Sequence, residues 1–198
     1  MKRFLIITIL LACIQAIDAQ TTTTLVLRNS KEYVGRITMQ RPGINLVFFD
    51  EKKDEEIDLK WSEIASIRTS LRNSSATEGL NDELTLLSGS VLTGQITEQS
   101  MDGTITLYLD NKQKSINVER KNILRTRKVA LNSAKTLLEQ RPYTNTVMTK
   151  SGSTYDGLII EQHYGKIPSE QYLVLLTTKG YNVNINFDDV ERYLYIPE

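Results

Sequence analysis

Seven of the nine tyrosines in this 198-residue chain lie in its last third. They are Tyr143, Tyr155, Tyr164, Tyr172, Tyr181, Tyr193 and Tyr195. Tyrosine can stack on a sugar ring or hold a peptide, because it combines a flat apolar body with a polar tip. It is also a favoured strand residue, and we favour that structural role as the general explanation. If a binding surface exists, its aromatic candidates are Tyr155, Tyr164 and Tyr172.

Basic residues dominate residues 120–141, where Glu139 is the single acid. They are Arg120, Lys121, Arg125, Arg127, Lys128, Lys135 and Arg141. Such a group could meet lipid phosphates, an anionic glycan or an acidic protein face. A solvated surface is the commoner origin of a basic run. We take Arg125, Arg127 and Lys128 as the basic candidates for an interaction surface.

No catalytic or cofactor-binding motif accompanies these residues. His163 is the only histidine, and it has no serine or cysteine nucleophile in a recognisable setting. The acidic run 50–56 lacks the ligand order of a calcium loop and is typical of a hairpin tip. Charge is balanced at 24 basic and 24 acidic residues, which argues against nucleic-acid binding. We therefore expect no enzyme, no cofactor and no metal site.

The segment 1–19 is typical of a secretory signal peptide. Lys2 and Arg3 precede an apolar run over 4–17, and Ala19 is small enough to precede a cleavage site. Cys13 offers a second interpretation, because the preceding residues loosely resemble the lipobox of bacterial lipoproteins. We expect cleavage after Ala19 and a secreted or periplasmic protein, with membrane attachment only if Cys13 is acylated.

The remaining sequence repeats three times. An offset of 59 aligns the first repeat with the second, and an offset of 63 aligns the second with the third. The third repeat contains an insertion around 163–170, after which the offset becomes 67. Gly35, Gly94 and Gly157 share one position in the alignment. Three tandem copies of one unit follow from these offsets.

Apolar residues alternate with polar ones in each repeat, as in half-buried strands. The repeated glycine lies within a strand, where glycine marks a bend or a close approach of two backbones. A stripe of alanine and leucine at helical spacing between repeats two and three predicts a helix that ends before Pro142. We predict a mainly all-β protein: three small barrels of four to five strands and one connector helix.

The predicted boundaries follow from these patterns. They are a signal peptide over 1–19, barrel one over 24–69, a linker over 70–83, barrel two over 84–127, the helix over 128–141, and barrel three over 143–198. A copy buries too little apolar surface to be stable alone, so we expect the copies to pack on one another or on a partner.

The run LTLLSGSVLTGQITEQ and the later INVERKNILRTR resemble a repeat of secreted proteins from Bacteroides-type Gram-negative bacteria. The layout is also similar to Sm-like (Src-homology-3-like) barrels, which share the bent, glycine-containing second strand. Repeat one departs from the pattern, because its turn Asn29-Ser30-Lys31 lacks glycine. The RNA-binding signatures of Sm proteins are not recognisable. The resemblance therefore implies a fold and an envelope location, and it implies no RNA binding.

We favour a non-enzymatic envelope protein whose tandem barrels dock a protein partner. The alternative is a module that binds carbohydrate or a surface polymer through the tyrosine-rich third repeat. A hydrolase with an unrecognised site that uses His163 is a third hypothesis.

Overall fold

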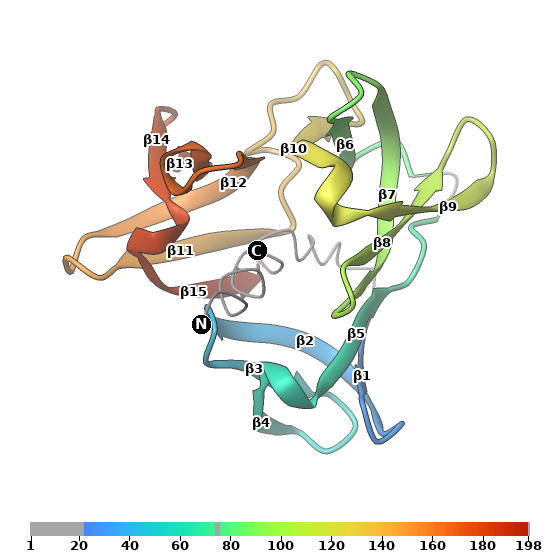
Figure 1. Ribbon diagram of the computed structural model, residues 1–198, viewed down its shortest axis with the longest axis vertical. Helices are drawn as coiled ribbons and strands as arrows, with labels where there is room; N and C mark the ends of the chain where they lie inside the picture. Colours follow the sequence, from blue (N-terminus) through green and yellow to red (C-terminus); the bar gives the residue numbers. More distant parts are fainter. Residues whose placement is uncertain (1–21, 74–75, 198) are drawn as a thin grey trace.

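The computed structural model describes residues 22–73 and 76–197, and within them it is an all-β protein (Figure 1). Each repeat contains five strands and a 3-10 turn directly before the fifth, and repeat three has a further 3-10 turn between its second and third strands. Repeat one comprises β1 (Thr23–Leu27), β2 (Glu32–Arg41), β3 (Asn45–Asp50), β4 (Glu55–Lys60), η1 (Trp61–Glu63) and β5 (Ile64–Thr69). Repeat two comprises β6 (Leu80–Leu86), β7 (Val91–Ser100), β8 (Thr104–Leu109), β9 (Lys114–Glu119), η2 (Arg120–Asn122) and β10 (Ile123–Ala130). Repeat three comprises β11 (Tyr143–Thr149), β12 (Thr154–Tyr164), η3 (Pro168–Glu170), β13 (Gln171–Thr177), β14 (Asn182–Asn186), η4 (Phe187–Asp189) and β15 (Val190–Pro197).

The second strand of each repeat changes partner at its glycine. Gly35 pairs with Thr23 of β1 and also with Asp50 of β3, so the strand is shared between two sheets. A Cβ atom at Gly35, Gly94 or Gly157 would lie 1.9, 2.0 or 2.1 Å from a backbone carbonyl oxygen of the neighbouring strand. Only glycine fits such a position, because a real Cβ never approaches an oxygen so closely. A bulge follows two to four residues later in every repeat and increases the bend.

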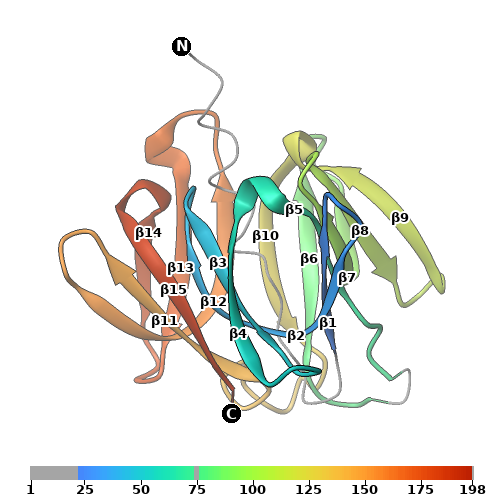
Figure 2. The same ribbon diagram turned by 90° about the horizontal axis from the view of Figure 1, so that it is seen from below.

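The fifth strand of each repeat pairs with the second strand of another repeat. β5 pairs with β7, β10 with β12, and β15 with β2. Together with the first strands, these strands close a barrel in the order β1-β5-β7-β6-β10-β12-β11-β15-β2. The hairpins β3–β4, β8–β9 and β13–β14 branch from this ring. Figure 1 shows the result as three lobes around a common centre, and Figure 2 shows their strands side by side.

The prediction of an all-β fold with barrel closure is confirmed, but the prediction of three tandem small barrels is wrong. Each repeat supplies three strands to one closed nine-strand barrel. The physical reason is the incomplete unit described above: a repeat cannot satisfy both edges of its own strands, and a neighbouring repeat supplies the missing edge.

The connector helix predicted over 128–141 is also wrong, because no α-helix occurs in residues 22–73 or 76–197. Ala130 instead continues β10 and pairs with Leu80. The buried side chain of Gln140 accepts hydrogen bonds from the Gly79 and Asn132 amides at 3.2 and 2.9 Å and donates to the Asn132 carbonyl oxygen at 2.8 Å. These contacts replace helical hydrogen bonds, and a segment this short has little tendency to nucleate a helix.

Apolar side chains form two clusters. Repeats one and three share the larger cluster, which includes Leu25, Phe48 and Leu173, each with 0% exposure. Repeat two forms a smaller cluster around Leu84, and Tyr164 packs against both clusters. Burying one such leucine or phenylalanine contributes roughly 1.5–3 kcal/mol, so much of the stability depends on the assembled ring.

Candidate binding surface

The strands β6, β10, β12, β13 and β14 form one continuous sheet across the junction between repeats two and three. We call this sheet the junction wall. Its inner face is buried and is formed by Leu84, Thr126, Gln162, Leu173 and Ile185. Its outer face is partly exposed and has a row formed by Thr85, Arg125, His163, Tyr172 and Asn186. Strand alternation therefore places the polar and aromatic side chains together on the outside.

His163 and Tyr172 are direct neighbours on β12 and β13, and their rings stack. The ring centroids lie 4.3 Å apart with an interplanar angle of 12°. The stack covers one face of the Tyr172 ring. The two rings brace each other, so that neither side chain has the rotamer freedom of an isolated surface residue.

Glu161 connects this stack to the basic residues of β10. Its Oε2 atom lies 2.9 Å from His163 Nε2 and 3.7 Å from Arg125 Nη1. In the adjacent row, Arg127 pairs with Glu83 of β6 at 2.9 Å between Nη2 and Oε1. The side chains of the Arg125–Glu161–His163 group are 21–31% exposed. The surface is therefore accessible, and its geometry is fixed by contacts between its own residues.

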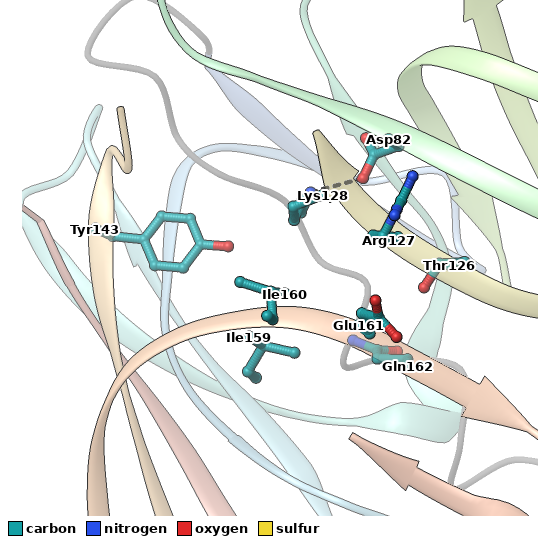
Figure 3. A pocket seen from close by; sticks show the side chains of 9 residues that line it. All are labelled: Asp82, Thr126, Arg127, Lys128, Tyr143, Ile159, Ile160, Glu161 and Gln162. Carbon is teal, nitrogen blue, oxygen red and sulfur yellow. Dashed lines mark hydrogen bonds and ion pairs between the residues drawn. The ribbon is translucent and has the colours of Figure 1, made fainter. Parts of the chain in front are cut away.

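A shallow pocket opens where β10 and β12 diverge, beside the outer face (Figure 3). Asp82 and Lys128 form an ion pair at its edge, with 2.7 Å between Oδ1 and Nζ and 6 and 11% of the two side chains exposed. The Tyr143 hydroxyl points toward this pocket from β11, and Ile159 lies on the facing strand (Figure 3). Asp82 also accepts a hydrogen bond from the Ile96 amide at 3.3 Å, which fixes its carboxylate against the bend of β7.

Equivalent glutamines lie on the inner face at all three junctions. Gln40, Gln99 and Gln162 are 1, 3 and 3% exposed. Gln162 accepts a hydrogen bond from the Tyr164 hydroxyl at 2.7 Å. The amide oxygen and nitrogen of Gln40 have no hydrogen-bond partner in the part of the chain that the structure describes. The junctions are thus alike in backbone and different in side-chain bonding.

The structure separates the aromatic candidates from one another. Tyr172 lies on the outer face of the junction wall, whereas Tyr155 and Tyr164 pack against the apolar core. The Tyr164 ring also lies beneath the Arg120 guanidinium, 4.9 Å from its centroid. Among the three tyrosines, Tyr172 is therefore the one placed to contribute to an outer binding face.

The basic candidates lie together on β10, but their surroundings differ. Arg125 and Arg127 lie on the outer face in the pairs described above, whereas Lys128 is largely buried against Asp82. The acidic run 50–56 forms the end of β3, a turn and the start of β4, as expected for a hairpin tip. Cys13 and the predicted signal peptide lie outside the described residues.

Glu161 and His163 were not predicted as parts of one surface, because the alignment of the repeats placed His163 at the start of the insertion in repeat three. A signal was present, since the offset of 63 aligns Glu161-Gln162 with Glu98-Gln99 and so extends the strand to this point. The offset of 59 likewise relates Gln99 to Gln40.

Comparisons with protein-family models, with curated proteins and with solved structures found no match. Within the described ranges, no helix is long and apolar enough to cross a membrane. The same ranges contain no cluster of three or more histidine, cysteine, aspartate or glutamate side chains arranged to hold a metal ion.

Proposed function

We propose that this chain is a non-enzymatic protein-interaction component of the cell envelope and that the outer face of the junction wall docks its protein partner. The proposal is carried by one observation: Arg125, Glu161, His163 and Tyr172 form a partly exposed group held by an ion pair, a hydrogen bond and ring stacking. Arginine and tyrosine are the side chains that most often supply binding energy at protein interfaces.

Preorganisation strengthens this argument. A long side chain that is immobilised on binding loses roughly 0.5–1.5 kcal/mol, and this loss is smaller when the side chain is already held in place. Arg125 is held by Glu161, and Tyr172 is held by His163. Arg125, Glu161 and His163 lie on β10 and β12 of the closed ring, and β13, which carries Tyr172, pairs directly with β12, so the group has a rigid base.

The equivalent place between repeats one and two provides an internal comparison. Ser66 and Ser100 occupy there the positions of Arg125 and His163. These short side chains offer few contacts to a partner. The backbone is the same at these two junctions, whereas the Arg125–His163–Tyr172 group occurs between repeats two and three and not between repeats one and two. This difference is expected when one junction has acquired a binding face.

Affinity capture with variants tests this proposal. The immobilised chain is incubated with envelope extract, and bound proteins are quantified for the unaltered chain, Arg125→Ala and Tyr172→Ala, with Ser66→Ala and Ser100→Ala as matched controls. We expect one partner whose affinity falls at least about tenfold in the first two variants, as for interface anchor residues, and is unchanged in the controls. Equal capture by all five chains, or no specific capture, contradicts the proposal.

A carbohydrate ligand remains the alternative, and the placement of the tyrosines gives it less support. Stacking on a sugar requires an open ring face. Tyr155 and Tyr164 pack against the core, and His163 covers one face of Tyr172. Binding on a glycan array that disappears with Tyr172→Ala would favour this alternative.

The proposed envelope location depends on the predicted signal peptide over 1–19. Mass spectrometry of the mature N-terminus tests it. A chain that begins at Gln20 supports secretion, an acylated Cys13 supports a lipoprotein, and an intact Met1 in envelope-free extract contradicts both.

A further inference from the structure

Each repeat leaves one strand at the edge of the sheet. In the described part of the chain, β4 pairs only with β3, β9 only with β8, and β14 only with β13. Unpaired edges of this kind can pair with another chain unless charge or shape prevents it. We infer that β14 is a self-association edge, on which a second copy of this chain adds its own β14 in antiparallel orientation.

The backbone groups of β14 that face outward can be identified from the hairpin. Thr177 N–H donates to the Tyr181 carbonyl oxygen at 2.9 Å, so these two residues form a hydrogen-bonded pair at the start of the ladder. Such pairs alternate along an antiparallel ladder, which assigns Val183 and Ile185 to the bonds with β13. The N–H and carbonyl groups of Asn182, Asn184 and Asn186 are therefore directed to the open edge.

The sequence of β14, Asn-Val-Asn-Ile-Asn, is nearly the same in both directions. A two-fold axis through Asn184 places Asn184 opposite its copy and Asn182 opposite Asn186. This register matches the residues whose backbone groups are free, and each such pair can exchange two hydrogen bonds. It also places Val183 opposite Ile185 on the inner side, so the faces of the two sheets remain continuous. A self-complementary strand is what an isologous interface requires.

Charge at the two ends of β14 favours the same register. Lys179 lies before the strand and Asp189 lies after it. Antiparallel pairing about Asn184 brings Lys179 of one copy toward Asp189 of the other, and the two-fold axis repeats this contact. Opposite charges at both ends stabilise this alignment over a shifted one.

The two equivalent edges are protected against the same association. In repeat one, Asp58 occupies the central position, so a two-fold pairing would place two carboxylates opposite each other. In repeat two, β9 carries charged side chains within the strand, Lys114 and Glu119, and its sequence Lys-Ser-Ile-Asn-Val-Glu is not the same in both directions, so it is not self-complementary. Charged side chains are the usual means of blocking an edge strand. The five residues of β14 contain none.

The proposed dimer has a consequence for binding. A two-fold axis perpendicular to the sheet leaves the outer faces of both junction walls on the same side. Two copies of the Arg125–Tyr172 surface would then engage a repetitive or dimeric partner together and gain avidity without any new contact.

The oligomeric state tests the inference. Sedimentation velocity over a concentration series compares the unaltered chain with Asn184→Lys and with Asn117→Lys, which places the same charge at the equivalent position of β9. We expect a reversible dimer for the unaltered chain and for Asn117→Lys, and a dissociation constant at least about tenfold higher for Asn184→Lys. A monomer at every concentration, or equal weakening by both substitutions, overturns the inference. Circular dichroism verifies that both variants are folded.

Cross-linking provides a second readout that does not depend on weakening the protein. In a chain with Cys13→Ser, Asn184→Cys places two thiols in one hydrogen-bonded pair, where the Cα atoms of facing residues lie about 5.5 Å apart and a disulfide can form. We expect rapid disulfide-linked dimers for Asn184→Cys and not for Asn117→Cys. Absence of the link in Asn184→Cys overturns the two-fold register. Because neither readout uses a partner protein, failure of the proposed partner binding leaves this test unaffected.

Discussion

Two junctions of the ring share a backbone and differ in their side chains. Between repeats two and three, Arg127 lies opposite Glu161 on the outer face. Between repeats three and one, Leu194 lies opposite Met39 at the equivalent place. At this position the first junction is charged and the second is apolar.

This difference indicates that backbone geometry closes the ring, since the same pairing forms with either kind of side chain. The two junctions also differ in whether a chain segment connects their repeats. Residues 131–142 connect repeats two and three, whereas repeats three and one meet without a connecting segment between β15 and β2. An apolar contact suits the junction that has no connecting segment, because its contribution to stability is not weakened by salt.

The largest effect is expected at the feature that both junctions share. Gly35→Ala and Gly157→Ala should each destabilise the fold by more than about 3 kcal/mol, because the added Cβ meets a backbone carbonyl that cannot move away. Gly152→Ala is the control. An added Cβ meets no neighbouring atom there, and the alanine is strained only by the positive φ of 87°. Its expected effect is about 1 kcal/mol. Denaturant unfolding measures the stability of all three variants. A small loss of stability in Gly35→Ala or Gly157→Ala would contradict the role of the bend in ring closure.

Breaking the buried ion pair of the charged junction should have the next largest effect. Lys128→Met leaves the Asp82 carboxylate without its cation and should reduce the free energy of unfolding by about 3 kcal/mol. The corresponding pair in repeat one is Thr23 with Thr69. The double variant Asp82→Thr with Lys128→Thr should therefore recover most of the loss. If the double variant is less stable than Lys128→Met, the two positions are not interchangeable between repeats.

Exchanging the two kinds of junction should have a moderate effect. Leu194→Arg should destabilise the apolar junction by roughly 1–2 kcal/mol, because it places an unpaired cation among apolar groups. Adding Met39→Glu should restore most of this stability by placing an acid opposite the new arginine, as Glu98 lies opposite Arg68 between repeats one and two. The control is Arg68→Leu, which removes the two surface ion pairs of Arg68 with Glu32 and Glu98. Because the arginine side chain is 49% exposed, stability should change by less than about 1 kcal/mol. Unfolding curves that show no coupling between positions 39 and 194 would exclude this pairing in solution.

The smallest effect is expected in the segment that connects the charged junction. Hydrogen bonds from the amide and hydroxyl of Thr136 lower the pKa of Glu139. Because the folded-state pKa lies below the unfolded value, the contribution is present above the unfolded pKa and is lost as the pH falls through the folded pKa. Glu139→Gln should therefore lower the melting temperature slightly at neutral pH and leave it unchanged at the lowest pH, which flattens the acidic limb of a melting-temperature profile. An unchanged acidic limb would show that this turn does not contribute to stability.

Much of the repeat plan was predictable, because alternation and fixed offsets act within one unit. The bent strand followed from Gly35, Gly94 and Gly157 alone. Pairing between repeats was not predictable. The alternation of apolar and polar residues in β5 is the same whether its second edge pairs within repeat one or, as observed, with β7 of repeat two. The ring depends on that choice.

The candidate surface was predictable only in part. Arg125, Arg127 and Tyr172 were identified by residue type, but their separation from Tyr155 and Tyr164 depends on which face of β12 and β13 each side chain occupies. The predicted helix failed for a related reason. Leu137 and Leu138 do pack against the core, but the buried Gln140 side chain, with no sequence signal of its own, organises that segment as turns.

Ring closure without a covalent connection between the outer repeats has a topological consequence. Each repeat pairs with both of the other repeats, so the barrel does not depend on which repeat comes first along the polypeptide. A circular permutant that joins Pro197 to Thr22 through a short flexible segment and opens the chain between β5 and β6 should therefore reach the same architecture.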